Sequence, residues 1–292
     1  MKKLLTWACG TAIALCAASQ QSVAQSQELA AEPEPAVSIG GDVAFNSRYM
    51  FWGLTLSNRP VWQPDVWLST HGVTFTVWAN NEFQEDSGGS DYTSGGARSG
   101  NTEIDYSVDY SWAMRGVESK LGVVRWTYNE DNTGVLGPYA PEDLPAGFRN
   151  GPDLDSTEIY ASLTWSNVAL SPNLSLFYDI DLYRGLFGWV GVSHDVPVGS
   201  RSLTLGGLTG FSFGESNTGS TDLPLHAKEG FTHVDLSASM AFEAGSVSVL
   251  PNVHVQFNID DATKATSATA FDEDWVVTFG ATLSWSRGFS AR

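Results

Sequence analysis

One long segment of the chain alternates strictly between apolar and polar side chains. Between residues 102 and 114 the apolar set includes Tyr106, Val108 and Tyr110, and the polar set includes Glu103, Asp105 and Asp109. Alternation with a period of two residues predicts a β-strand with one apolar face and one polar face. A strand in a soluble protein is usually about five or six residues long, whereas a tilted strand needs about ten residues to cross a bilayer. The length of this segment therefore favours a membrane-spanning strand.

About twelve such segments follow one another along the chain. They are predicted at 37–56, 61–70, 73–83, 102–114, 119–129, 156–167, 173–183, 186–196, 201–213, 231–243, 246–259 and 274–286. The long connections, at 84–101, 130–155, 214–230 and 260–273, all follow odd-numbered strands, and the others, including the first at 57–60, are short. Outer-membrane barrels alternate long extracellular loops and short periplasmic turns in this way. The sequence therefore predicts an all-β fold: a transmembrane antiparallel β-barrel of about 12 strands, with both termini in the periplasm.

The start of the chain has the features of an export signal. Lys2 and Lys3 precede a short apolar stretch, and small residues at 22–24 form a cleavage site, so residues 1–24 are predicted to be a signal peptide. Residues 25–36 are polar and contain prolines, which predicts a flexible periplasmic tail. The barrel itself is expected to occupy residues 37–292.

The last predicted strand carries a candidate assembly signal. Thr278, Gly280, Leu283 and Trp285 have the polar, glycine, hydrophobic and aromatic spacing that the barrel-assembly machinery recognises, although seven residues follow Trp285 and the motif usually closes at the chain terminus. Together with the signal peptide, this pattern predicts a location in the outer membrane of a Gram-negative bacterium. The predicted partners are outer-membrane lipid, the assembly machinery and small solutes.

Composition excludes several kinds of chemistry. Cys9 and Cys16 both lie in the predicted signal peptide, so we expect the mature chain to have no thiol for a disulfide, a metal site or a nucleophile. The formal net charge is −18 at pH 7, which argues against a nucleic-acid partner. We expect no cofactor and no metal site.

The first predicted hairpin resembles a known family. Residues 41–54 read GDVAFNSRYMFWGL, and Pro60, Gln63, Pro64 and Gly72 follow in the hairpin. This segment looks like the opening of the TorF-like porins, whose first strand ends in an aromatic-x-Gly bend. The resemblance implies an outer-membrane β-barrel and a channel, and it supplies no substrate. Trp52 stands where most relatives would have Arg, so no role of that Arg is carried over.

The polar parity of the strands is expected to face the barrel interior. The candidate residues for lining the lumen and setting its selectivity are Asp42, Arg48, Glu103, Asp105, Asp109, Asp179, Asp181 and Asp235. Carboxylates at this density could not all stay ionised in a dry core, because desolvation and mutual repulsion disfavour the charged form. A water-filled lumen removes that penalty, and rings of carboxylates in a wet pore favour cations. Arg48 and Arg125 are expected to be the main lumen cations.

Tryptophans divide between the two predicted faces. Those expected to face lipid, as aromatic girdles near the strand ends, are Trp62, Trp112, Trp126, Trp165, Trp275 and Trp285. Those expected to face inward are Trp52, Trp67, Trp78 and Trp189. Inward tryptophans fill space between strands more often than they stack on sugars.

These features favour a non-enzymatic channel for passive, weakly cation-preferring diffusion of small solutes. The alternative is a structural or ligand-binding barrel whose function lies in the loops at 84–101 and 130–155. An outer-membrane hydrolase is less favoured. Ser193, His194 and Asp195 are adjacent in sequence, so their side chains alternate between faces and cannot form a relay. The sequence leaves the oligomeric state open.

Overall fold

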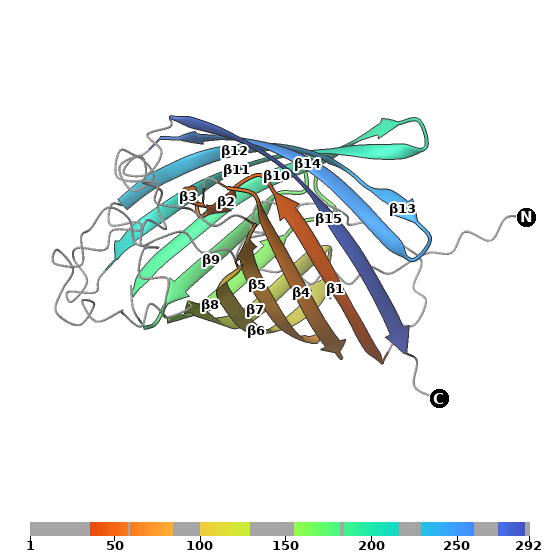
Figure 1. The fold of residues 1–292 in the computed structure, drawn as a ribbon, viewed down its shortest axis with the longest axis horizontal. Coiled ribbons are helices and arrows are strands. Elements are labelled where there is room, and N and C mark those ends of the chain that lie inside the picture. The colour runs from red at the N-terminus through yellow and green to blue at the C-terminus, as the bar shows by residue number, and fades with distance from the viewer. Residues whose placement is uncertain are drawn as a thin grey trace, which may run out of the picture.

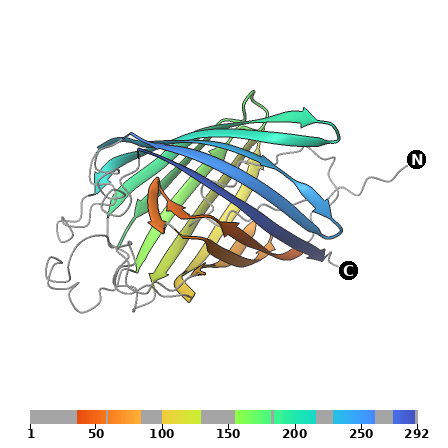
Figure 2. The same cartoon turned by 45° about the horizontal axis from the view of Figure 1, so that its top comes forward.

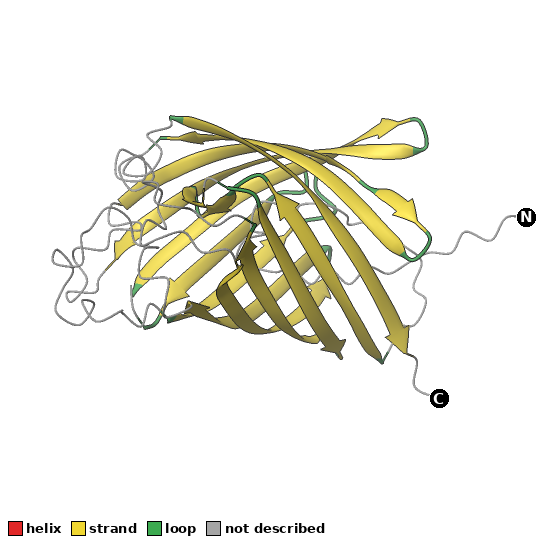
Figure 3. Ribbon diagram, viewed as in Figure 1, coloured by secondary structure: helices red, strands yellow, loops and turns green. Residues whose placement is uncertain are grey.

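A computed structural model describes residues 36–57, 59–83, 100–128, 155–181, 184–215, 229–259 and 274–289. The regular structure in these ranges consists of β-strands (Figure 3). Within them, no helix has the length and hydropathy needed to span a membrane.

Twelve strands of the described chain form a closed ring in which all neighbours are antiparallel. In chain order they are β1 (Val37–Asn46), β4 (Val61–Thr70), β5 (Val73–Glu82), β6 (Gly100–Met114), β7 (Val117–Tyr128), β8 (Ser156–Thr164), β9 (Asn173–Asp179), β10 (Gly185–Val198), β11 (Arg201–Glu215), β12 (Glu229–Met240), β14 (Val247–Asn258) and β15 (Trp275–Phe289). Strand β13 (Phe242–Ala244) extends β12 along the edge of β14. The ring closes where β15 pairs with β1 (Figure 1). The predicted barrel and its strand count are confirmed.

The two faces of the barrel have opposite polarity. On β6, Tyr106, Val108 and Tyr110 are 42, 44 and 49% exposed on the outside, whereas Asp105 and Asp109 are 2 and 3% exposed on the inside. The same alternation places apolar side chains outward on the neighbouring strands. Exposed apolar side chains around a polar interior are the reverse of a soluble barrel and are the arrangement of a barrel that stands in lipid.

Short turns connect the strands at one end of the barrel. Val37 pairs with Phe289, so the beginning of β1 and the end of β15 lie together at this end (Figure 1). His71 and Gly72 have φ of 50° and 81°, as a type I′ hairpin turn requires of its two central residues. The segments between β5 and β6, β7 and β8, β11 and β12, and β14 and β15 leave the opposite end. The long loops predicted there lie mostly outside the described residues.

The first predicted strand is wrong in its length. We expected one strand at 37–56 and a short connection at 57–60. Instead β1 ends at Asn46, and the chain folds back as a small hairpin, β2 (Tyr49–Phe51) and β3 (Leu54–Ser57). Trp52 and Gly53 have φ of 48° and 89°, so they reverse the chain where the alternation suggested continuity. This hairpin lies inside the ring of strands (Figure 2).

Candidate functional site

The β2–β3 hairpin joins the lumen wall in one buried aromatic cluster. Its tip places Trp52 with ring centroids 4.7 Å from Phe187 and 5.2 Å from Trp126, and Phe51 lies 5.1 Å from Trp126. Tyr49 of the hairpin lies 6.1 Å from Trp78. Phe177, Trp189 and Tyr160 complete the cluster, and every member is buried. At the level of the hairpin, side chains therefore fill this side of the lumen.

Polar contacts hold the hairpin between opposite parts of the wall. The Tyr49 hydroxyl donates a hydrogen bond of 2.8 Å to Glu103 Oε2 on β6. Gln256 Nε2, on β14, donates a hydrogen bond of 2.6 Å to the Gly53 carbonyl. A Cβ atom on Gly53 would lie 2.7 Å from Cγ of His233 on β12, so only glycine allows this close approach. The hairpin thus spans the lumen from β6 to β12 and β14.

Most of the candidate carboxylates line the inside of the barrel. Glu103, Asp105, Asp109, Asp179 and Asp235 are buried on the inward parity of their strands. Asp42 also faces inward, in register with Asp65, and the Asp42 amide donates to Asp65 Oδ1. Alternation also places Glu158 beside Tyr160 on the inward parity of β8, as the structure has it, although Glu158 was not among the selectivity candidates. Sequence reasoning missed Asp65, which the alternation along β4 beside Gln63 and Trp67 could have revealed.

Glu158 and Asp179 bring two acidic side chains together on the inner wall. They are directly opposite each other in the β8–β9 ladder, and both are almost fully buried. The Ser156 hydroxyl donates to Asp179 Oδ2. In the described residues, no group of histidines and carboxylates is arranged to hold a metal ion.

A lysine and a histidine side chain contact lumen carboxylates. Lys120 Nζ lies 3.4 Å from Asp109 Oδ1, and the Tyr160 hydroxyl donates to Asp109 Oδ2. His254 Nδ1 lies 2.9 Å from Asp235 Oδ1. Lys120 was not among the expected lumen cations. Its inward position follows from Val124 and Trp126, which share its parity and are buried.

Arg125 lies outside the lumen, contrary to the prediction, and Trp126 lies inside it. Arg125 is in register with the outward Tyr106, whereas Trp126 is in register with the inward Asp105. The adjacent Val123 and Val124 are both apolar, so the sequence pattern does not fix the parity of this strand. Arg48, the other expected lumen cation, is half-buried in the link between β1 and the hairpin.

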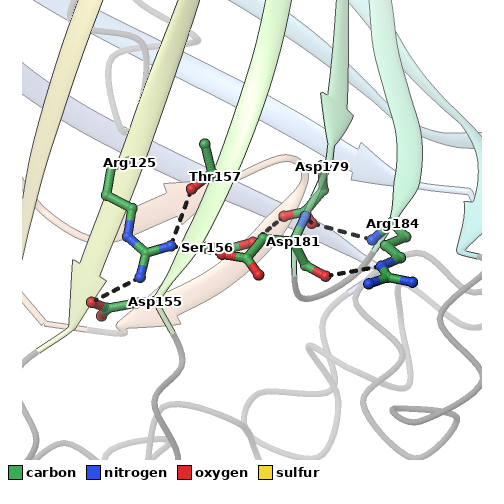
Figure 4. A network of polar contacts seen from close by, with 7 residues as sticks. All are labelled: Arg125, Asp155, Ser156, Thr157, Asp179, Asp181 and Arg184. Carbon is green, nitrogen blue, oxygen red and sulfur yellow. Dashed lines mark hydrogen bonds and ion pairs between the residues drawn. The ribbon is translucent and has the colours of Figure 1, made fainter.

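Arg125 belongs to a polar network at the rim (Figure 4). It donates to Asp181 Oδ2 at 2.7 Å, to the Thr157 hydroxyl at 3.0 Å and to Asp155 Oδ2 at 3.4 Å. Asp181 follows the end of β9, and its side chain is 53% exposed, so it lies at the rim and not on the lumen wall. Arg184 contacts the same segment through its amide, which donates to Asp179, and through Nε, which donates to the Asp181 carbonyl. The network joins β7, β8 and the β9–β10 connection.

The other tryptophans divide largely as the alternation indicates. Trp112, Trp275 and Trp285 are exposed on the outside, and Trp67, Trp78 and Trp189 are buried on the inside. Trp62 is on the outward parity of β4 and half-buried, and Trp165 lies in the turn after β8. In β15, Thr278 and Gly280 face inward, while Leu283 and Trp285 face outward. Their role as an assembly signal stays a prediction.

The described residues contain a histidine–carboxylate pair but no completed catalytic relay. His254 and Asp235 face the lumen, and no serine or threonine hydroxyl in the described ranges bonds to His254. Asp195 accepts a hydrogen bond of 2.6 Å from Thr204, so its described partner is not His194.

These features define the class of the protein: a transmembrane β-barrel of the outer-membrane type, with a hairpin folded into its lumen. No protein-family model matches the chain, and no curated protein sequence matches it. The resemblance to the TorF-like porins therefore rests on the residues quoted for it.

Solved barrels with similar topology share few residues with this chain. LpxR from Salmonella typhimurium is 7% identical, with a TM-score of 0.46, over 85% of this chain and 99% of that chain. A KdgM porin in complex with disordered oligogalacturonate is 9% identical, with a TM-score of 0.41, over 86% and 99%. An outer membrane channel from Pseudomonas putida F1 is 9% identical, with a TM-score of 0.46, over 90% and 100%. Similarity at this level carries no argument about function.

Proposed function

We propose that this protein is a porin-like channel in the outer membrane of a Gram-negative bacterium, through which small solutes diffuse passively with a weak preference for cations. The observation that carries the proposal is the carboxylate-rich inner face of the barrel. Asp105, Glu158 and Asp179 come from three strands, β6, β8 and β9, and all point inward. A polar interior in a lipid-facing barrel is suited to hold water.

The charge balance of the wall supports the cation preference. Among the described lumen residues, the Lys120 ammonium is paired with Asp109, while the carboxylates of Asp42 and Asp65 face each other without an intervening cation. Acidic side chains along a wet pore attract cations and repel anions. A ring of twelve strands is wider than the eight-stranded barrels that side chains fill and narrower than a sixteen-stranded porin. We therefore expect a narrow passage and a modest selectivity.

Reversal potentials in planar bilayers under a salt gradient test this function. The full-length mature protein should give a reversal potential of the sign that indicates cation preference. The Asp105→Asn and Glu158→Gln double variant should move that potential towards zero. Asp181→Asn is the matched control, because it removes the same kind of charge from the rim. Anion preference of the unmodified channel, or an equal shift in the control, would contradict the proposal.

A structural or ligand-binding barrel is the second candidate function. The observation that favours it is the aromatic cluster, since the hairpin fills part of the lumen. Deletion of the segments 84–101 and 130–155 separates the two functions. A channel should keep or gain conductance after the deletion, whereas a binding barrel should show no conductance and should lose its ligand.

A further inference from the structure

We propose that the β2–β3 hairpin is a gate: it closes the lumen where it now lies, and solutes pass only when it withdraws towards the rim. The inference rests on the proposed channel function. Both ends of the hairpin join the same end of the barrel, where β1 ends and β4 begins. It is therefore tethered at one end only, which is the attachment that a withdrawing segment needs.

The hairpin is independent of the barrel wall in its backbone pairing. Strands β2 and β3 pair with each other in a separate two-stranded sheet, and neither is a neighbour of any strand in the large sheet. Withdrawal would therefore break none of the ladders that close the ring. A loop that contributed a strand to the wall could not move in this way.

Contacts on opposite sides of the lumen make the hairpin an obstruction. Trp52 and Phe51 pack against Trp126 on β7, while Gly53 contacts His233 on β12 and Gln256 on β14. The hairpin thus bridges walls that lie five strands apart in the ring. We expect the hairpin to block solutes at this level while it keeps both sets of contacts.

The closed packing carries local penalties that withdrawal would relieve. Trp126 Nε1, Glu158 Oε1 and Asp235 Oδ2 are buried and have no hydrogen-bond partner among the residues that the structure describes. Buried polar atoms without partners are unfavourable. Water that enters behind the withdrawing hairpin would hydrate them, which offsets part of the aromatic contact that is lost.

An engineered disulfide that fixes the hairpin to β12 tests the gate directly. A Cβ atom on residue 53 would lie 2.7 Å from the Cγ position of His233, which brings the two Cβ atoms within the range that a disulfide requires. The chain's own cysteines, Cys9 and Cys16, lie in the predicted signal peptide, so the engineered pair should be unambiguous. We expect the oxidised G53C/H233C variant to conduct at least tenfold less than the same protein after reduction with dithiothreitol.

The single variants G53C and H233C are the matched controls and should not respond to dithiothreitol. G53C also shows any effect of placing a side chain at position 53, where φ is 89°. That effect is the same in both redox states. Mass spectrometry of the membrane-inserted protein verifies the disulfide. Equal conductance of the cross-linked and reduced protein would overturn the gate, because solutes would then pass with the hairpin fixed in place.

A second variant does not depend on the disulfide. Residues 50–56 are replaced by a Gly-Ser segment of the same length, which removes the aromatic tip and leaves every ladder of the ring intact. This variant should conduct severalfold more than the unmodified protein. If this variant and the unmodified protein conduct equally, the hairpin is not a gate, and the proposed channel function is unaffected. If the unmodified protein, the reduced G53C/H233C variant and the Gly-Ser variant all fail to conduct, the protein is not a channel. Both the proposed channel function and the proposed gate are then refuted.

Discussion

The lipid-facing surface can be tested by a charge at its centre, with Val108→Arg as the perturbation. Val108 lies near the middle of β6, in register with Phe75 on β5 and Val123 on β7, and all three side chains are exposed on the outside. Arginine on the lipid face of an outer-membrane barrel costs about 2–4 kcal/mol at the bilayer midplane. Since about 1.4 kcal/mol corresponds to a tenfold change, the folding equilibrium should fall by roughly 30- to 700-fold.

The assay is the folded fraction in lipid vesicles across a urea gradient, measured by the heat-dependent gel shift that distinguishes folded from unfolded barrels. Val108→Leu is the control at the same position and should fold like the unmodified protein. Val255→Arg, outward on β14 opposite Leu236 and Val277, should repeat the loss seen for Val108→Arg. If Val108→Arg folds as well as Val108→Leu, the outward face does not contact lipid and the orientation of the barrel faces is wrong.

Three further substitutions test the inside, the seam and the rim. Asp109→Asn leaves the Lys120 ammonium without its carboxylate, so urea titration should show a loss of about 1–3 kcal/mol; a variant as stable as the unmodified protein would mean that water already solvates this pair. Gly280→Ala would place a Cβ atom 2.6 Å from the Phe45 carbonyl, so the folded fraction in vesicles should fall. Unchanged folding would show that the backbone where β1 pairs with β15 can shift to make room for the added methyl group. Arg125→Gln, at the exposed rim, should change stability by less than about 1 kcal/mol and leave the reversal potential unchanged; a shifted potential would place this network on the ion path.

The structure corrects one expectation about the inner face. From the alternation alone, Asp109→Asn should be nearly neutral, because a wet lumen tolerates loss of a charge. Lys120 was not recognised as a lumen residue, and its pairing with Asp109 makes this carboxylate part of a buried ion pair. Breaking one partner of such a pair is more damaging than removing an exposed charge.

Clean alternation explains which parts of the barrel could be predicted. In the central part of β6 and over residues 252–258 of β14 the apolar and polar residues alternate, so Val108, Asp109 and Gln256 lie on the expected faces. In β7 the adjacent Val123 and Val124 are both apolar, so the sequence pattern does not show which side chains face the lumen. The prediction placed Arg125 inward and Trp126 outward, and both placements are wrong. Only the partners in β6 settle the orientation, because Arg125 pairs with the outward Tyr106 and Trp126 with the inward Asp105.

The inward hairpin could not be predicted from periodicity because its residues continue the pattern of β1. Tyr49 and Phe51 keep the odd-numbered apolar parity of the outward Ile39 and Phe45, although they and Met50 are all buried inside the barrel. The local clue is Trp52–Gly53, since glycine at the second position of a two-residue turn is a hairpin signal. Whether such a hairpin extends outward or folds into the lumen depends on contacts with strands far away in the sequence, such as that between Gly53 and Gln256, which are 203 residues apart.

The aromatic and acidic parts of the lumen have a single physical explanation if the hairpin moves. A permanently dry interior would not place Glu158 opposite Asp179, because two buried carboxylates repel each other and lose hydration. A permanently wet interior would not place Trp52, Trp126 and Phe187 on its inner surface, because exposed aromatic area is unfavourable in water. A lumen that alternates between the two conditions accounts for both. The aromatic rings bury one another while the hairpin is in place, and the carboxylates regain water when it leaves.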